Sequence, residues 1–189
     1  MHHRQYALCP LCSILLQKIA KAGWRMLTGV AVLGVKLMGV LGKFEANGPT
    51  LMGMWRRAQS LPGGKALFSR LAGRMAPYTA TIGARVEVLE PGFARLSMAD
   101  RKAVRNHLKS VHAVALVNFV EETTGMAMVS QFPAGVRGIV TNINVDFRKK
   151  ARGLLQAECR APDIDPSESG RYVVRTEVTN QAGELVAEG

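Results

Sequence analysis

The chain has 189 residues, of which 48% are hydrophobic, so it can hold about one domain with a buried core and an appended segment. Its formal net charge is +11, and residues 1–61 hold eight Lys or Arg side chains against one acidic side chain. This basic excess indicates membrane or polyanion contact by the N-terminal part. No zinc-finger spacing or RNA-binding aromatic motif accompanies it, so we predict no nucleic-acid partner.

Residues 26–42 are apolar but rich in glycine, and Lys36 interrupts them. A membrane-spanning helix needs about 20 uninterrupted apolar residues, so this stretch is short for an anchor. No clear signal-peptide cleavage site follows it. With basic residues on both flanks, residues 18–43 could lie as a helix on an anionic membrane surface. The alternative is that residues 1–50 are a disordered extension; in either case we expect residues 51–189 to form the folded domain.

Three cysteines cannot form a disulfide framework. Cys9 and Cys12 make a single CxxC pair, and Cys159 falls in a strand-like alternating pattern. A zinc site would need two further ligands, so we predict no metal and no cofactor. Free thiols are typical of a reducing compartment, and we expect a cytoplasmic protein, with membrane association left open.

Two short helices are predicted next, over residues 55–59 and 65–75, because a Pro-Gly-Gly sequence breaks the chain between them. Leu67, Leu71 and Met75 repeat every four residues and predict one buried stripe on the second helix. These helices would precede the sheet as an N-terminal helical extension.

From residue 82 onward, apolar and polar residues alternate, which is the pattern of half-buried strands. Residues 82–88 and 94–98 form the two arms of a hairpin around a Pro-Gly turn. No crossover helix separates the later strands, so the sheet should be antiparallel. These later strands are predicted at residues 139–147, 155–159, 172–178 and 185–187, the last of them incomplete.

Between the hairpin and the later strands lies a helix that starts at Ala113. From there to Val120 only Asn118 is polar, so the helix is apolar nearly all round and must be enclosed. One long helix wrapped by an antiparallel sheet is the hotdog architecture. We therefore predict an α+β hotdog fold with an N-terminal helical extension.

The segment around this helix carries a motif of Asn106, then His112 and Ala113 at the helix start, then Glu121. It resembles the active-site segment of hotdog-fold acyl-CoA thioesterases of the phenylacetate-pathway type. Residues 55–189 also resemble a branch of that superfamily known only as a domain of unknown function. The motifs shared with that branch are Leu-Pro-Gly-Gly at 61–64, Pro-Tyr-Thr at 77–79 and Lys-Lys-Ala-Arg-Gly at 149–153.

The resemblance implies a role for each motif residue in thioester hydrolysis. The backbone N–H of Ala113 would donate to the thioester oxygen, helped by the positive end of the helix dipole. Glu121 would be the general base for water, or the nucleophile that forms an anhydride. Asn106 would orient the water or the substrate carbonyl. His112 would hold the turn and could hydrogen-bond the substrate carbonyl. The family takes the carboxylate and the oxyanion donor from different subunits, so we expect a homodimer or a dimer of dimers.

The chain departs from the family pattern at three places. Ala113-Val114 replaces the usual Gly-Gly, which narrows the approach of the thioester to the helix start. The family's hydroxyl residue would fall at Val140; the neighbouring Thr141 is our substrate-binding candidate, although it would face the opposite side of a strand. The sequence also stops at Gly189, where the family usually continues with another strand.

Each candidate could instead have an ordinary structural role. Glu121, beside Glu122, could belong to a solvated helix face, but a carboxylate after eight nearly unbroken apolar residues usually has a partner. Adjacent helical side chains point about 100° apart, so these two are not expected to face one site. Asn106 could cap a helix and His112 could be structural. The run Arg148-Lys149-Lys150 could meet the phosphates of coenzyme A or be a solvated loop.

We therefore predict an acyl-CoA thioesterase that hydrolyses an acyl thioester and releases coenzyme A. The alternative is a non-catalytic hotdog module that binds acyl chains or acts through dimeric association at a membrane surface. The motif spacing favours the enzyme, and the loss of Gly-Gly favours the binding module.

Overall fold

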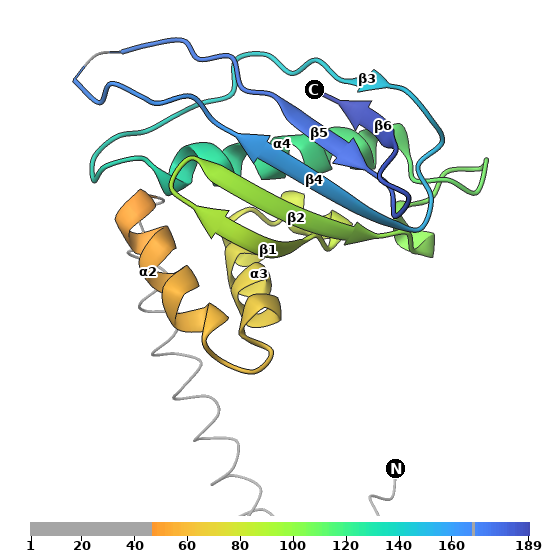
Figure 1. The fold of residues 1–189 in the computed structure, drawn as a ribbon, viewed down its shortest axis with the longest axis horizontal. Coiled ribbons are helices and arrows are strands. Elements are labelled where there is room, and N and C mark those ends of the chain that lie inside the picture. The colour runs from red at the N-terminus through yellow and green to blue at the C-terminus, as the bar shows by residue number, and fades with distance from the viewer. Residues whose placement is uncertain (1–46, 168) are drawn as a thin grey trace, which may run out of the picture. The chain divides into compact units, whose positions relative to one another are not determined.

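The computed structural model describes residues 47–167 and 169–189 (Figure 1). The membrane-surface segment predicted at residues 18–43 lies outside these ranges, as do the Cys9–Cys12 pair and most of the predicted extension. Within the described ranges, no helix combines the length and the hydropathy needed to cross a membrane.

Two helices come first, α2 (Gly48–Gln59) and α3 (Gly64–Met75). The sequence predicted only residues 55–59 as the first helix, but α2 starts earlier because its N-terminus is capped. The Asn47 side chain accepts a hydrogen bond of 3.0 Å from the N–H of Thr50, and a proline occupies the first turn. Both features stabilise a helix start.

α3 buries a different face from the predicted one. Phe68 is 1% exposed, whereas Leu67 is 52% exposed and Met75 is 38% exposed. Phe68 packs edge-on against Trp55 of α2, with ring centroids 5.1 Å apart, and the buried Ala72 follows it one turn later. Stripes through Leu67 and through Phe68 both have helical spacing, and the stripe with the aromatic ring has the larger apolar area to bury.

This difference gives a stability prediction for two neighbouring residues. Phe68→Ala should lower the free energy of unfolding by about 3–5 kcal/mol, because it leaves a cavity against Trp55. Leu67→Ala should change it by less than about 0.5 kcal/mol, because Leu67 is exposed. Urea unfolding followed by circular dichroism measures both. Equal losses, or a larger loss at Leu67, would contradict the burial of α3.

The sheet has six strands in the order β1-β2-β4-β5-β6-β3, and every neighbouring pair is antiparallel, as predicted. The strand predicted to be incomplete corresponds to β6, which lies between β5 and β3. The strands are β1 (Arg85–Glu90), β2 (Phe93–Ala99), β3 (Asp146–Phe147), β4 (Leu154–Arg160), β5 (Thr176–Thr179) and β6 (Leu185–Glu188).

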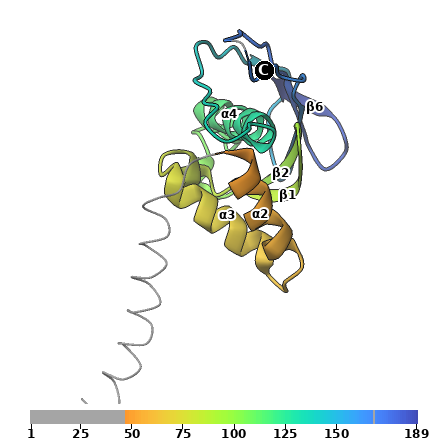
Figure 2. The ribbon, with the colours of Figure 1, turned by 90° about the vertical axis from the view of Figure 1, so that its left-hand side faces the viewer.

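α4 (Ala113–Ser130) begins at the predicted residue and lies along one face of the sheet. Figure 2 shows α4 beside the strands. The helices α2 and α3 lie near β1, at one edge of the sheet. Phe119 and Ala127 of α4 are fully buried in the core that it forms with the sheet. The prediction of one long helix enclosed by an antiparallel sheet is confirmed.

The first strand has a different inward face from the predicted one. Ile82 belongs to the short 3-10 helix η1 (Thr79–Ile82), so β1 starts only at Arg85. A bulge between Val86 and Val88 shifts the register, and Leu89 is buried in place of Val88. A bulge inserts one residue into the alternation, which reverses the faces of the residues after it.

Two predicted strands are shorter than their alternating patterns. Of the predicted strand at 139–147, only Asp146–Phe147 pairs with a neighbour. In place of the predicted strand at 172–178, pairing starts only at Thr176 and runs to Thr179. Residues 139–145 alternate apolar and polar side chains in sequence, but they have no strand partner in the described part of the chain, and residues 139–144 are all exposed. Because β3 is at the edge of the sheet, its outer backbone groups are open to pairing.

Candidate active site

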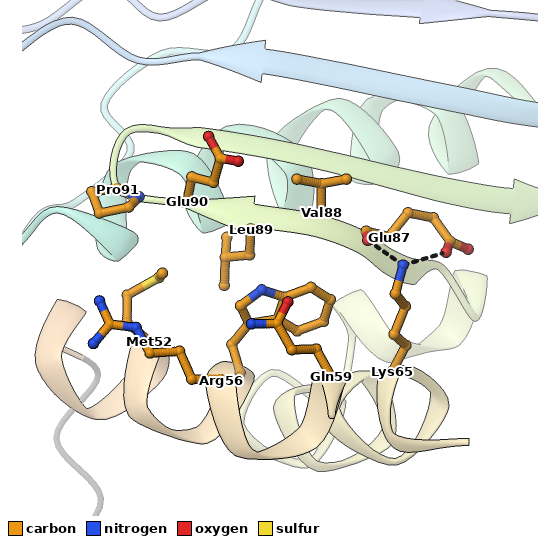
Figure 3. Close-up of a pocket in the computed structure, with 10 residues that line it drawn as sticks. Met52, Arg56, Gln59, Lys65, Glu87, Val88, Leu89, Glu90 and Pro91 are labelled. Carbon is orange, nitrogen blue, oxygen red and sulfur yellow. Dashed lines mark hydrogen bonds and ion pairs between the residues drawn. The ribbon is translucent and has the colours of Figure 1, made fainter. Parts of the chain in front are cut away.

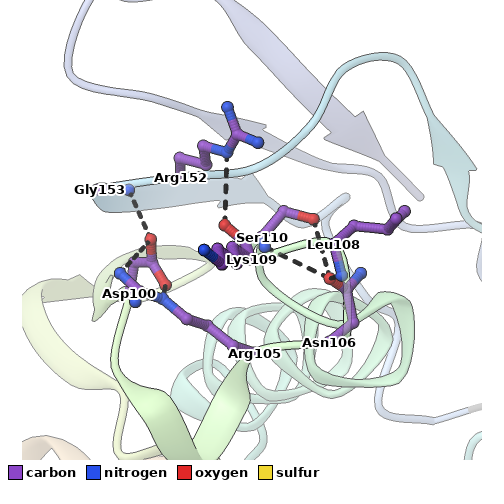
Figure 4. Close-up of polar contacts among 8 residues, drawn as sticks. All are labelled: Asp100, Arg105, Asn106, Leu108, Lys109, Ser110, Arg152 and Gly153. Atoms are coloured by element: carbon purple, nitrogen blue, oxygen red, sulfur yellow. Dashed lines mark hydrogen bonds and ion pairs between the residues drawn. The ribbon is translucent and has the colours of Figure 1, made fainter.

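The loop from Arg105 to Val111 leads into α4 and carries the predicted Asn106. An isolated bridge pairs Arg105 with Val111 and closes the loop. The Asn106 Oδ1 accepts hydrogen bonds from the N–H groups of Leu108 (2.9 Å) and Ser110 (3.3 Å) and from the Ser110 hydroxyl (3.2 Å) (Figure 4). Asn106 therefore shapes this loop and does not cap a helix. Its amide nitrogen has no hydrogen-bond partner among the described residues.

Two hydrogen bonds join this loop to Ala151 and Arg152, which follow the basic residues 148–150. The N–H of Val111 donates to the carbonyl of Ala151 at 2.9 Å, and Nε of Arg152 donates to the carbonyl of Lys109 at 3.3 Å. These bonds hold the start of α4 against the chain that enters β4.

Asp100 adds a third attachment (Figure 4). It accepts hydrogen bonds from Nε of Arg105 at 2.6 Å and from the N–H of Gly153 at 3.1 Å. The Arg105 guanidinium lowers the pKa of Asp100, so this carboxylate stays ionised and keeps both bonds at neutral pH.

His112 is the N-cap of α4. Its Nδ1 accepts a hydrogen bond of 3.1 Å from the N–H of Val114, and the backbone N–H of His112 donates to the carbonyl of Val104 at 2.8 Å. The N–H of Ala113 has no partner among the described residues and stands at the exposed start of the helix. A free N–H at the positive end of a helix dipole is suited to stabilise a developing oxyanion.

Glu121 lies about two turns further along α4 and faces a cavity of ≈ 700 Å³. Thr124 of the same helix lines this cavity, together with residues 140–144 and 171–177. Glu121 is half-buried and has no hydrogen-bond partner in the described parts of the chain, and burial raises its pKa. A carboxylate with a raised pKa at the wall of an open cavity can take a proton from water.

Glu122 faces another side of α4 and does not line this cavity. Burial, and then repulsion from Glu121, raises the pKa of Glu122 to about 7. Its Oε2 is buried and is the one such side-chain atom without a hydrogen-bond partner among the described residues. The two neighbouring carboxylates therefore lie in different surroundings, as the helix geometry predicted.

Glu122 gives a prediction for stability against pH. Its folded pKa is raised from 4.5 to about 7, so the folded state favours the neutral carboxyl and loses stability as the pH rises from about 4.5 through 7. Glu122→Gln should leave the melting temperature unchanged near pH 4 and raise stability at pH 8 by about 3 kcal/mol. Thermal unfolding at a series of pH values measures this. A variant that follows the wild-type pH dependence would contradict the burial of this carboxylate.

The predicted catalytic residues and Thr141 fall into two separate groups. Glu121 and Thr141 both line the cavity, whereas Asn106, His112 and Ala113 lie at the start of α4 and do not. Eight residues of helix, about 12 Å along the axis, separate Ala113 from Glu121. Within one copy of the chain, the Ala113 N–H and the Glu121 carboxylate therefore do not meet at the same point.

Two of the three basic residues at 148–150 form ion pairs. Arg148 pairs with Glu188 at 2.6 Å, and Lys149 pairs with Glu184 at 2.7 Å, both on the exposed surface of β6 and its turn. Lys150 has no ion pair in the described ranges. Of the three predicted phosphate-binding cations, Lys150 keeps its charge free.

Sequence reasoning missed two cations that line the cavity, Arg171 and Arg175. They flank Tyr172 and Val174, which were predicted as the inward residues of a strand, so their positions were assigned to the outer face. Because residues 171–175 pair with no strand, both faces of this stretch can reach the cavity. Two arginines spaced four apart beside an apolar stretch are the signal that could have found them.

A second cavity, of ≈ 430 Å³, lies between α2 and β1 (Figure 3). Lys65 lies at one end of it and donates to the carbonyl of Glu87 at 2.6 Å. None of the predicted site residues lines this cavity. Within the described residues, no three His, Cys, Asp or Glu side chains cluster as metal ligands would.

Residues 64–189 match the family described as "Domain of unknown function (DUF4442)". A crystal structure from structural genomics is similar at 31% identity over 73% of this chain and 91% of its own, with a TM-score of 0.63. A Pseudomonas aeruginosa protein of unknown function, described as a probable thioesterase, is 29% identical over 68% of this chain and 91% of its own, with a TM-score of 0.54. The PaaI protein of the E. coli phenylacetic acid degradation operon shares the fold at 21% identity over 67% of this chain and 95% of its own, with a TM-score of 0.51. No protein with a curated description matches the sequence.

Proposed function

This chain belongs to the DUF4442 family, within the hotdog-fold thioesterase superfamily, and from this premise we propose that it hydrolyses an acyl-CoA thioester. The observation that carries the proposal is the position of Glu121. It is a half-buried carboxylate without a partner among the described residues, with a raised pKa, and it lines a cavity of ≈ 700 Å³. That cavity has room for an acyl group and a water molecule.

Glu121 acts as the general base that takes a proton from water, or as the nucleophile that forms an anhydride. Its raised pKa strengthens it as a base at neutral pH, because a stronger conjugate acid holds the proton more firmly. Thr141 lines the same cavity and can hydrogen-bond the substrate, and Arg171 and Arg175 add positive charge there.

The start of α4 supplies the other half of the reaction. The N–H of Ala113 donates to the thioester oxygen as charge develops on it, and His112 holds that N–H in place by capping the helix. Asn106 uses its oxygen inside its own loop, which leaves its amide nitrogen to donate to water or to the carbonyl. Lys150 lies next to Ala151, to which this loop is bonded, and it can meet the phosphates of coenzyme A.

The active unit is a homodimer or a dimer of dimers. Ala113 and Glu121 are about 12 Å apart along one helix, so a site that uses both needs a second copy of the chain. The open edge at β3 supports this assembly. Ile139, Ile143 and Phe147 near that edge are 87%, 46% and 48% exposed, which is more apolar area than a free edge usually shows to water.

Release of free thiol from short, aromatic and long-chain acyl-CoAs tests the function. Hydrolysis of at least one class by the full-length chain is expected, and the preferred chain length reports the depth of the cavity. A folded dimer that releases no thiol from any of them would contradict the enzyme.

A second candidate is a hotdog module that binds an acyl chain without cleaving it. The observation that favours it is Val114, which is 53% exposed at the helix start, where the phenylacetate-pathway-type thioesterases that the motif resembles usually have glycine. Its side chain narrows the approach to the Ala113 N–H. Acyl-CoA binding measured by calorimetry, in the absence of thiol release, would support this second function.

A further inference from the structure

The net positive charge of the chain comes entirely from residues 1–86. Residues 47–86 contain six Lys or Arg and no Asp or Glu, whereas residues 87–189 contain thirteen basic and thirteen acidic residues. From residue 47 onward, all of the net charge therefore comes from α2, α3 and the start of β1. The catalytic proposal uses none of these elements.

Two of these six basic side chains lie on the outer face of α3, together with apolar side chains. Leu67, Arg70, Leu71 and Arg74 are spaced at i, i+3, i+4 and i+7, so they share one side of the helix. Leu67 is 52% exposed, both arginines are exposed, and Leu71 is half-buried. Neither arginine has an ion pair among the described residues. We call these four residues the α3 face.

Exposed apolar residues continue at both ends of α3. Leu61, just before the helix, is 58% exposed, and Tyr78, just after it, is 70% exposed. Leu67 and Leu71 belong, with Met75, to the stripe that the sequence alone assigned to the core. Because Phe68 takes the inner position, Leu67 points outward and Leu71 is only half-buried, and packing within the described residues does not account for this exposed apolar area.

A helix that lies on a membrane surface needs basic side chains for the headgroups and apolar side chains for the acyl-chain boundary, and the α3 face presents both. Arginine is attracted to anionic headgroups, and leucine and tyrosine gain free energy when they enter the boundary of the acyl chains. A nucleic acid would attract the arginines but offers little to exposed leucines. Residues 1–46 hold six basic residues and one acidic residue, so their positive charge would be repelled by Arg70 and Arg74. This repulsion disfavours a contact between residues 1–46 and the α3 face.

We propose that the α3 face docks on the surface of an anionic lipid bilayer. The contact is independent of thioester hydrolysis. It also lies on a different part of the chain from the membrane segment predicted at residues 18–43.

Co-sedimentation of the full-length chain with vesicles tests this proposal. Vesicles of phosphatidylcholine with one quarter phosphatidylserine are compared with vesicles of phosphatidylcholine alone. The wild type should bind the anionic vesicles, and Arg70→Glu with Arg74→Glu should weaken that binding by about 10- to 100-fold. The matched control, Lys109→Glu with Arg137→Glu, makes the same charge change at exposed sites outside the α3 face and should bind as the wild type does.

A second variant separates the apolar contribution from the charge. Leu67→Ser should weaken binding to anionic vesicles several-fold while its dependence on salt stays that of the wild type. All the substituted residues are exposed, so the melting temperatures should match that of the wild type. Residues 1–46 are present in every variant, so their contribution cancels.

Three results would overturn the proposal. One is equal binding to both kinds of vesicle, and another is an α3 double variant that binds as its control does. The third is binding to a single-stranded oligonucleotide, and not to vesicles, that the α3 double variant loses. That result would assign the α3 face to a nucleic acid.

Discussion

Glu121→Gln should lower the turnover of acyl-CoA hydrolysis by about 10²- to 10⁴-fold, the contribution typical of a positioned general base. Glutamine keeps the shape of the side chain but cannot take a proton from water. Glu121 lines the cavity and has no other partner among the described residues, so the substitution should leave the fold intact. Thiol release under single-turnover conditions measures the loss at the chemical step.

The neighbouring carboxylate is the matched control. Glu122→Gln removes the same charge one residue further along α4, but Glu122 does not line the cavity. It should keep the activity within a few-fold of the wild type at pH 7. If Glu122→Gln abolished hydrolysis and Glu121→Gln did not, the roles of the two residues would be exchanged.

The pH profile gives a further check on the base. Glu121 must be ionised to act, so kcat/KM should rise with pH through its pKa, which burial holds above the ordinary value of 4.5. This rising limb should disappear in Glu121→Gln. A rising limb that stayed unchanged in the variant would show that another group titrates.

Ala113→Pro should lower turnover by about 10²- to 10³-fold, because it removes the proposed oxyanion donor. Proline has no N–H, yet it is favoured at the first position of a helix, where that N–H makes no intrahelical bond. His112 already has φ −67° and ψ 142°, a conformation that a following proline accepts. The fold and the cap should therefore survive, which circular dichroism and thermal unfolding would verify.

Ala113→Ser controls for the added bulk at the same position, since it keeps the N–H. It should retain most of the activity. If the serine variant were as inactive as the proline variant, the position would matter for its space and not for its N–H, and the oxyanion assignment would fail.

Mixing the two inactive variants tests whether the site is shared between protomers. In a symmetric dimer with composite sites, a heterodimer of Glu121→Gln and Ala113→Pro has one site with both wild-type groups. Random exchange should then restore about one quarter of the wild-type sites. If both groups came from the same protomer, the mixture would stay inactive.

Several elements could be predicted because their patterns are local. α4 starts at Ala113 as predicted. Its burial could be predicted too, because a helix with apolar residues on nearly every side is stable only inside a protein. Ala94, Leu96 and Met98 alternate regularly in β2 and are all buried. In the candidate site, the spacing along α4 was enough to separate Glu121 from Glu122.

Other features depended on which neighbours the folded chain supplies. The pairs of Arg148 with Glu188 and Lys149 with Glu184 join residues that are far apart in the sequence. Arg171 reaches the cavity because its segment pairs with no strand. Residues 139–145 alternate as a strand does, but β3 pairs Asp146 with Glu188, the last residue of β6, so the residues before Asp146 meet no strand among the described residues.

The sequence by itself determined that one apolar helix must be enclosed by an antiparallel sheet, and that an amide, a histidine and a carboxylate accompany it. These conclusions rest on residues a few positions apart, whose relation a helix or strand fixes directly. Only the tertiary structure decided that α3 turns Phe68 inward and Leu67 outward, and that β1 bulges after Val86. Stripes of similar spacing compete for one buried surface, and the choice between them depends on the shape and area of the partner that they meet.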